Sequence, residues 1–343
     1  MNRAEPQTDE SLLRLASQLT ERVGKGRPRA LSRLAGGKNN QVYRVETEAG
    51  ASLILKRYFT DPRDPRDRLG AEWDFLKHAW SQGIRAVPEP LACDAASHAG
   101  LYGFVAGRKL LASELTPAHI DAAIDFVLAV NVRPRAPLAP GSEACFTLAE
   151  HISTVERRVV RLATLDPDAP HAKQAQSFVS TRLLPAWDAV KSQLAADARA
   201  VGLSMELALS PDDCCLSPSD FGFHNALVDD EGRVTFLDFE YAGRDDPAKL
   251  VSDFFCQPEI PVPLDYHATF IARMAEGFGL DETGRACCRM LLDAYRIKWT
   301  CIILNDFLPL GAARRAFADT GTWAARCASQ LAKAEAKLAG LKA

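Results

Sequence analysis

The chain has 343 residues, of which 47% are hydrophobic, so it can form two domains or one two-lobed unit with a sizeable core. Its 41 basic and 44 acidic residues give a net charge of −3, which does not favour a nucleic-acid or membrane-surface partner. The N-terminus lacks the apolar core of a secretion signal, and no stretch approaches about 18 apolar residues, so we expect a cytoplasmic protein without membrane insertion. The 9 cysteines have no metal-ligand spacing, and their odd number favours buried thiols over a disulfide framework.

The first third of the chain predicts a small lobe rich in β-strands. Apolar residues recur at helical spacing in two stretches, which predicts helices over residues 9–23 and 69–82. Period-two alternation between turn residues predicts strands elsewhere in this region. These strands cover residues 30–35, 41–46, 52–58, 87–93 and 100–107. The turn between the first two strands is rich in glycine.

The rest of the chain predicts a mainly helical lobe that contains one β-hairpin. Candidate helices cover residues 116–131, 146–164 and 171–199. The pattern is helical again from residue 265 onwards. Two short apolar runs at 226–228 and 234–237 flank the sequence Asp-Asp-Glu-Gly, which is typical of a hairpin turn. The predicted fold class is therefore α+β, with a β-rich lobe followed by a helical lobe.

Four residues of the small lobe suit phosphoryl transfer from a nucleotide, which needs a loop over the phosphates and a cation on them. Gly36 and Gly37 lie in the first turn, where the lack of a Cβ lets backbone N–H groups approach an anion, although glycine pairs also occur in plain hairpin turns. Lys56 lies in an apolar strand and needs an anionic partner if it is buried, but edge strands also use lysine against aggregation. Glu72 can supply that partner, or it can simply favour the first turn of its helix.

A polar loop and the hairpin that follows it add a candidate metal site. Asp220 and Asn225 have the spacing D-x4-N, and Asp238 follows across the hairpin. A tight turn can bring Asn225 and Asp238 together as hard oxygen ligands, which Mg²⁺ prefers. The letters DFG at 220–222 suggest instead that Asp220 binds the metal. That register lacks an amide ligand, because the chain has no asparagine between Asn131 and Asn225.

One segment resembles the catalytic core of the aminoglycoside phosphotransferase and choline kinase-like family, relatives of the protein kinases. Residues 216–250 read LSPSDFGFHNALVDDEGRVTFLDFEYAGRDDPAKL, and the pieces GGKNNQVYRV, LILKRY and AEWDFL lie where this family has its nucleotide loop, lysine and helix glutamate. The resemblance extends loosely over residues 30–310. It implies the protein kinase-like two-lobed fold, with a nucleotide-binding lobe and its preceding helix at 1–107 and a helical catalytic and substrate-binding lobe at 108–343.

The resemblance also implies roles for single residues. Asp220 corresponds to the catalytic aspartate, and Asn225 and Asp238 correspond to the Mg²⁺ ligands. Lys56 corresponds to the lysine on the α- and β-phosphates of ATP, with Glu72 as its ion-pair partner. The expected ATP-binding residues are Gly36, Gly37, Lys56, Glu72, Phe104 and Ala106, the last two in a hinge at 104–107 that offers backbone groups to adenine.

Three features depart from the family pattern or leave alternatives open. Relatives commonly have His-Gly before the catalytic aspartate, whereas this chain has Pro218-Ser219, and proline lacks a backbone N–H. The family pattern DPAxDL corresponds to DPAKL at 246–250, without the final acid, and Asp253 is a candidate replacement. His224 is expected to pack in the loop or to face the substrate, because a base needs a positioned partner.

The leading hypothesis is an ATP-dependent kinase that transfers the γ-phosphoryl group to a hydroxyl of a small molecule. The alternative is a nucleotide-binding pseudokinase that serves as a scaffold without turnover. A protein-substrate kinase is less favoured, because no Ala-Pro-Glu segment follows Asp238. The acceptor stays open among amino alcohols, sugars and aminoglycosides. Possible amine-binding acids are Glu240, Asp245, Asp246 and Asp253, and possible acid-binding cations are Arg244, Arg296 and Lys298.

Overall fold

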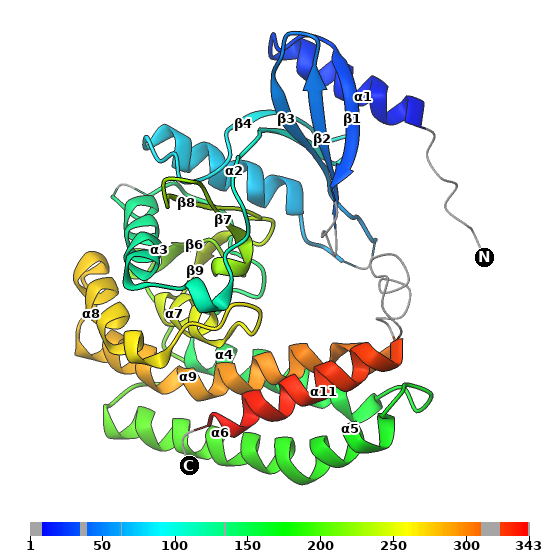
Figure 1. The fold of residues 1–343 in the computed structure, drawn as a ribbon. Helices are drawn as coiled ribbons and strands as arrows, with labels where there is room; N and C mark the ends of the chain where they lie inside the picture. Colours follow the sequence, from blue (N-terminus) through cyan, green and yellow to red (C-terminus); the bar gives the residue numbers. More distant parts are fainter. Residues whose placement is uncertain (1–8, 35–39, 63, 134, 310–322, 342–343) are drawn as a thin grey trace. The chain divides into compact units, whose positions relative to one another are not determined.

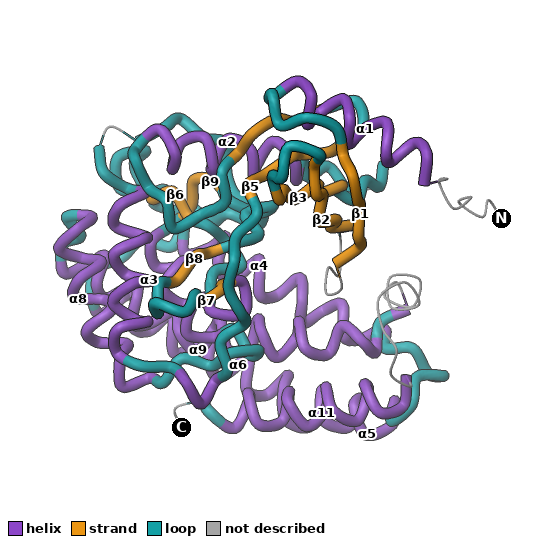
Figure 2. The backbone as a smooth tube through the Cα atoms, turned by 45° about the horizontal axis from the view of Figure 1, so that its top comes forward, coloured by secondary structure: helices purple, strands orange, loops and turns teal. Residues whose placement is uncertain are grey.

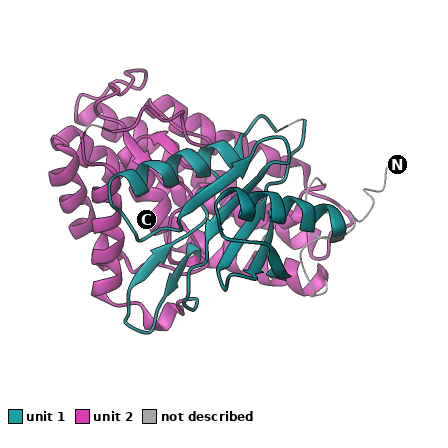
Figure 3. Cartoon of the chain, turned by 90° about the horizontal axis from the view of Figure 1, so that it is seen from above, with its two compact units in different colours: residues 1–109, 225–241 teal, residues 110–224, 242–343 magenta. Residues whose placement is uncertain are grey.

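The computed structural model describes residues 9–34, 40–62, 64–133, 135–309 and 323–341. These residues separate into two compact units, coloured differently in Figure 3. Unit 1 comprises residues 1–109 and 225–241, and unit 2 comprises residues 110–224 and 242–343. The predicted lobe boundary after residue 107 stays a prediction. The glycines Gly36 and Gly37 of the predicted nucleotide turn lie outside the described residues.

A five-stranded antiparallel sheet forms the body of unit 1 (Figure 1). Its strands are β1 Pro28–Leu34, β2 Gln41–Thr47, β3 Ser52–Arg57, β4 Pro90–Asp94 and β5 Ala99–Gly103, in the spatial order β1-β2-β3-β5-β4. The register pairs Lys56 of β3 with Val42 of β2 and with Gly100 of β5. Because β3 has a neighbour on each side, Lys56 is not an edge-strand lysine, and the protective role weighed for it from the sequence does not apply.

Two helices pack on opposite faces of this sheet. They are α1 Asp9–Arg22 and α2 Arg68–Ser81. Leu12 and Leu19 of α1 join one apolar core with Leu55 of β3. Successive strand residues point to opposite faces, so Lys56 points away from this core and bonds Glu72 of α2 on the other face. The alternation in β3 therefore separates an apolar face from a charged one.

The predicted hairpin is present in unit 1. It consists of β7 Ala226–Val228 and β8 Val234–Phe236. Asp229 Oδ1 accepts bonds from the backbone N–H groups of Glu231 and Arg233, at 3.0 and 2.9 Å, which closes the turn. Gly232 has φ +79°, a conformation that favours glycine.

Unit 2 is mainly helical (Figure 2). Its helices are α3 Pro117–Val130, α4 Leu148–Arg161, α5 Ala172–Phe178, α6 Leu184–Ala200, α7 Pro247–Cys256, α8 His267–Phe278, α9 Glu282–Ile303 and α11 Trp323–Ala339. One apolar core combines residues of α4, α6, α9 and α11, among them the buried Trp187 and Ile297. A β-sheet region followed by a helical region confirms the predicted α+β class. None of the helices in the described ranges is long and apolar enough to cross a membrane.

The helix predicted over residues 171–199 is present as one continuous helical run with a π-helical turn inside it. α5 ends at Phe178, a π-helical turn covers Val179–Leu183, and α6 begins at Leu184. Proline lacks the N–H that a helix needs and clashes with the carbonyl four residues earlier. Pro185 stands in the first turn of α6, so the wider π turn before it relieves that clash.

A short sheet and a buried helix surround the loop that contains Asp220. β6 Cys215–Ser217 pairs antiparallel with β9 Gly243–Asp245. Asp246 then caps α7, since its Oδ1 accepts a bond from Ala248 N at 2.7 Å. All 10 residues of α7 are buried. The sequence patterns predicted neither β9 nor α7 as separate elements.

Candidate functional site

Three predicted site residues of unit 1 meet at one ammonium group. Lys56 Nζ lies 2.6 Å from Glu72 Oε2 and 2.5 Å from Asp238 Oδ1. Lys56 and Glu72 are 7% and 4% exposed, whereas the side chain of Asp238 is 40% exposed. The predicted ion pair between Lys56 and Glu72 is therefore present, and the aspartate that follows the hairpin joins it. The roles assigned to the three residues stay a prediction.

Burial and the nearby carboxylates shift the pKa of Lys56 in opposite directions. Burial alone lowers its pKa, but the carboxylates of Asp238 and Glu72 outweigh burial and raise the pKa above its usual range. For Glu72, burial raises the pKa, although the Lys56 ammonium partly opposes the shift. Lys56 therefore remains a cation, and two carboxylates share its charge.

Two tyrosines that the sequence did not mark extend this group. Tyr58 donates from its hydroxyl to Glu72 Oε2 at 2.8 Å, and the hydroxyls of Tyr58 and Tyr102 are 2.7 Å apart. A Cβ added to Gly100 would lie 2.3 Å from the Tyr102 hydroxyl oxygen, so the tyrosine ring occupies the space that glycine leaves open. Alternation along β3 was the available signal, because Tyr58 follows Lys56 by two residues.

Asn225 and Asp238 approach each other through the backbone of the hairpin. Leu237 N donates to the carbonyl oxygen of Asn225 at 2.8 Å, so Asn225 lies opposite the residue that precedes Asp238. Asp238 has φ +66°, in the left-handed region that few non-glycine residues adopt. Such backbone strain concentrates at functional sites. The role of Asn225 and Asp238 as Mg²⁺ ligands stays a prediction.

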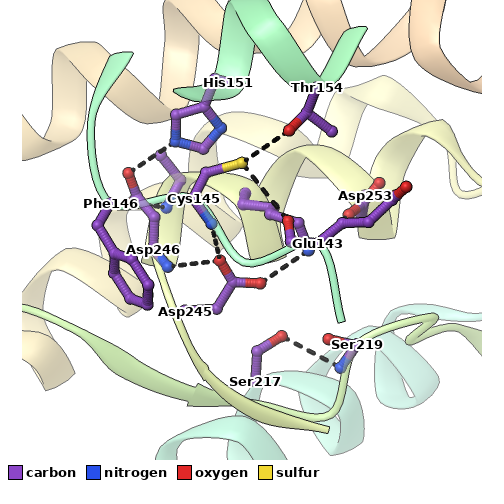
Figure 4. A network of polar contacts seen from close by, with 12 residues as sticks. Glu143, Cys145, Phe146, His151, Thr154, Ser217, Ser219, Asp245, Asp246 and Asp253 are labelled. Carbon is purple, nitrogen blue, oxygen red and sulfur yellow. Dashed lines mark hydrogen bonds and ion pairs between the residues drawn. The ribbon is translucent and has the colours of Figure 1, made fainter. Parts of the chain in front are cut away.

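Asp220 belongs to unit 2 and also has a left-handed backbone. Its φ is +36°, and that of Ser219 is +48°. Ser219 N donates to Ser217 Oγ at 3.1 Å, which supports the strained turn (Figure 4). His224 Nε2 lies 3.3 Å from Asp220 Oδ1, so the histidine contacts the predicted catalytic carboxylate. The expected place of His224, packed in the loop or facing the substrate, stays a prediction.

The predicted hinge has an irregular backbone. Phe104 is half-buried, with the Arg44 guanidinium 4.4 Å from the centre of its ring, and Ala106 is exposed. Arg108 N donates to Val228 O at 2.9 Å, and Gly107 has φ +142°. A Cβ on Gly107 would lie 2.9 Å from the same carbonyl oxygen, so this close approach requires glycine. Contacts of Phe104 and Ala106 with adenine stay a prediction.

A buried network in unit 2 engages acids that the sequence offered for acceptor binding. Lys249 Nζ lies 2.7 Å from Asp245 Oδ2, and Lys298 Nζ lies 2.8 Å from Asp253 Oδ1. Trp299 Nε1 donates to the same Asp253 oxygen at 2.8 Å. Figure 4 shows Asp245 and Asp253 among the residues of this network. Both acids therefore already bind cations of the chain.

His151 links this network to the cap of α7. Its Nε2 lies 3.0 Å from Asp246 Oδ2, and its Nδ1 lies 2.7 Å from the Tyr295 hydroxyl. Burial alone lowers the pKa of His151, but the bond to Asp246 outweighs it and raises the pKa to about 10. The imidazolium therefore compensates the buried carboxylate. No sequence motif marked His151, because its partners lie far along the chain.

Solved structures of known proteins resemble this chain at low sequence identity. A choline/ethanolamine kinase family protein from Mesorhizobium loti has a TM-score of 0.54 and 18% identity, covering 90% of this chain and 88% of that one. Spectinomycin phosphotransferase in complex with ADP and spectinomycin has a TM-score of 0.60 and 13% identity, covering 97% of this chain and 99% of that one. Amicoumacin kinase in complex with AMP-PNP and Ca²⁺ has a TM-score of 0.56 and 18% identity, covering 97% of this chain and 93% of that one. These similarities confirm the predicted protein kinase-like fold.

The amino-acid sequence itself identifies the family. No curated protein sequence matches the chain. The model of the phosphotransferase enzyme family, however, matches residues 30–291. This range includes every predicted site residue, from the turn glycines to the aspartate that follows the hairpin. The chain therefore belongs to the phosphotransferase enzyme family.

Proposed function

We propose that this protein is an ATP-dependent kinase that transfers the γ-phosphoryl group to a hydroxyl of a small molecule. The observation that carries the proposal is the contact of Lys56 with both Glu72 and Asp238, at 2.6 and 2.5 Å. A nucleotide kinase site needs a lysine held at the phosphates by a helix glutamate, and an aspartate for the metal ion. One structural relative is bound to ADP and another to AMP-PNP, which supports the same cofactor class here.

In this proposal Lys56 binds the α- and β-phosphates. An ammonium has three N–H donors, and the bonds to Glu72 and Asp238 use two of them. Glu72 holds the lysine side chain in position, and Tyr58 orients the glutamate through its hydroxyl. The raised pKa of Lys56 supports a permanent cation at the phosphates.

Asp238 and Asn225 fit a Mg²⁺ ion. Both offer hard oxygen ligands, which Mg²⁺ combines with water and phosphate oxygens. The main-chain bond from Leu237 to Asn225 and the partial exposure of Asp238 support a site open to a ligand. When bound, the metal would supply positive charge that neutralises the transferring phosphoryl group.

Asp220 is the proposed catalytic residue. Its carboxylate would accept a hydrogen bond from the acceptor hydroxyl and orient it towards the phosphoryl group. The side chain is 38% exposed and contacts His224. Both the strained backbone and the exposure support a role in chemistry rather than in the core.

The acceptor is proposed only as a small molecule with a hydroxyl group. Asp245 and Asp253 bind the lysines Lys249 and Lys298, so we do not assign to them the recognition of an amine. An acceptor screen by coupled ADP release, across amino alcohols, sugars, amino sugars and aminoglycosides, identifies the class. The cytoplasmic location stays a prediction.

The test compares three variants in steady-state transfer from Mg·ATP. Asp220→Asn and Asp238→Asn remove a charge but keep a side chain that tolerates the left-handed backbone, so they separate chemistry from strain. We expect each to lower kcat/KM by at least about 100-fold. The matched control is Asp230→Asn, an exposed aspartate in the hairpin turn, which should retain wild-type activity.

Two outcomes contradict parts of the proposal. Unchanged transfer in both Asp220→Asn and Asp238→Asn would refute the roles given to these residues. Thermal stabilisation by Mg·ATP without turnover on any acceptor would instead support the pseudokinase alternative.

A further inference from the structure

A buried polar cluster in unit 1 joins three segments that are distant in the sequence. Asn40 Nδ2 donates to Glu240 Oε2 at 2.7 Å, and Arg68 Nε lies 3.5 Å from the same oxygen. Arg68 also donates to Asp64 Oδ2 at 2.6 Å. We call Asn40, Arg68 and Glu240 the Asn40 cluster.

The cluster also holds the chain just after β3. Asn40 Oδ1 accepts a bond from Phe59 N at 3.3 Å, and Arg68 Nη1 donates to Phe59 O at 3.0 Å. Both backbone groups of Phe59 are therefore bonded to members of the cluster. Phe59 follows Lys56 by three residues, so the cluster fixes the end of the strand that carries the lysine.

The three side chains of the cluster are buried. Asn40, Arg68 and Glu240 are 8%, 2% and 4% exposed. A buried carboxylate is stable only when it has charged or hydrogen-bonding partners, and Glu240 has both. The sequence offered Glu240 as a candidate for binding an amine of the acceptor, but the structure directs its carboxylate to Asn40 and Arg68 instead.

Each member is joined by a short stretch of chain to a part of the proposed nucleotide site. Asn40 accepts a bond from Phe59 N, three residues after Lys56, and Glu240 follows Asp238 by two residues. Arg68 precedes Glu72 by four residues in α2, so both side chains lie on one face of that helix. A shift of any member therefore moves a phosphate-binding or metal-binding group.

We propose that the Asn40 cluster positions the Lys56–Glu72 pair and Asp238 for nucleotide binding. Its members are positioning residues, because each acts through a neighbour. This inference rests on the proposed function. It adds that Glu240 determines affinity for the nucleotide and takes no part in binding the acceptor.

The experiment compares Glu240→Gln and Asn40→Ala with the wild type. We measure KM and kcat for Mg·ATP, KM for the acceptor and, by calorimetry without acceptor, the Kd for Mg·ATP. Each variant weakens the bonds within the cluster. Each should therefore raise the KM and the Kd for Mg·ATP about tenfold and leave the KM for the acceptor unchanged within about twofold. The control Glu231→Gln removes an exposed charge from the hairpin turn and should change neither constant.

Amide hydrogen exchange at Phe59 reports the cluster without any nucleotide. Asn40→Ala removes the hydrogen-bond acceptor of the Phe59 N–H. It should therefore increase the hydrogen-exchange rate of that amide while the protein remains folded. Parallel loss of protection across all of unit 1 would indicate a merely structural role and would overturn the inference.

The remaining outcomes separate the inference from the proposed function. A wild type that neither binds nor turns over Mg·ATP overturns the proposed function and the inference with it. An active wild type whose variants keep the nucleotide constants unchanged overturns the inference alone. A higher Mg²⁺ requirement in Glu240→Gln, with normal nucleotide KM at saturating Mg²⁺, would also overturn it, by identifying Glu240 as a metal ligand.

Discussion

Replacing Lys56 by methionine tests the charge balance of the site, because methionine keeps an unbranched side chain, one atom shorter, and removes the ammonium. At 2.6 Å from Glu72, the gross Coulomb attraction is about 6 kcal/mol with an effective dielectric constant of about 20. Desolvation of both buried ions offsets most of this attraction. Removing one partner of a buried pair nevertheless costs about 3–5 kcal/mol, since the other charge is left uncompensated. The contact with Asp238 adds less, because that side chain is 40% exposed and screened by water.

The loss in Lys56→Met should depend on pH. Burial already raises the pKa of Glu72 above its ordinary value of 4.5, and loss of the ammonium removes the main opposing effect. The folded variant then binds a proton that the unfolded chain releases, so its stability falls as pH rises through the raised pKa of Glu72. We therefore expect a larger destabilisation at about pH 8 than at about pH 5.

Urea unfolding at both pH values, with a double-mutant cycle, measures these effects. Glu72→Gln alone should destabilise less than Lys56→Met, because Lys56 keeps its contact with Asp238. The double variant Lys56→Met/Glu72→Gln should recover at least about 1 kcal/mol over Lys56→Met at the higher pH, since no uncompensated buried charge remains. An equal loss at both pH values, without recovery in the double variant, would refute this reasoning.

Three further variants test other parts of the structure. Gly100→Ala brings a Cβ to 2.3 Å from the Tyr102 hydroxyl and should destabilise by about 1–3 kcal/mol, measured as a lower urea midpoint; an unchanged midpoint would contradict this contact. The pKa of His151 is raised to about 10, so between about pH 7 and pH 10 the folded protein binds a proton that the unfolded chain has lost. The stability of the wild type therefore falls by at most about 1.4 kcal/mol per pH unit over this range. His151→Gln should flatten this part of the profile of stability against pH. If the stabilities of His151→Gln and the wild type change in parallel with pH, His151 does not bind that proton in the folded protein. Asp253→Asn weakens the partner of Lys298 and should destabilise by about 3 kcal/mol, with the acceptor KM unchanged; a selective rise in acceptor KM would return Asp253 to the acceptor site.

Local patterns predicted those elements whose residues alternate or repeat within one segment. Five strands and the position of Lys56 on an apolar strand follow from period-two alternation, and the hairpin follows from two apolar runs that flank a turn sequence. β9 was missed because its three residues, Gly-Arg-Asp, form no apolar run, unlike the equally short strands β7 and β8. α7 was missed although Lys249, Ser252 and Asp253 lie at helical spacing, because its 10 residues are fewer than the window over which a helical repeat is read.

Long-range polar partners account for what the sequence could not predict in the site. From the sequence, Glu240 and Asp253 are candidates for binding an amine. Their partners in the structure, Asn40 and Lys298, are 200 and 45 residues away along the chain. Without those partners, a carboxylate next to a catalytic loop is equally consistent with ligand binding and with internal ion pairing. Folding decides between the two, because burial of an acid requires a cation or donor of the chain itself.

The departure at Pro218-Ser219 has a structural explanation. Relatives commonly have glycine before the catalytic aspartate, and glycine adopts a left-handed backbone without steric cost. Ser219 has φ +48° and Asp220 has φ +36°, so this chain keeps the left-handed turn with serine in place of glycine, at a cost of about 1 kcal/mol or more. The bond from Ser219 N to Ser217 Oγ, together with the pairing of Ser217 with Gly243, offsets part of that strain. A turn kept despite its cost indicates that its conformation, rather than glycine itself, is what the loop requires. Since that conformation orients Asp220, the substitution alters how the loop is stabilised while leaving the carboxylate available for the proposed chemistry.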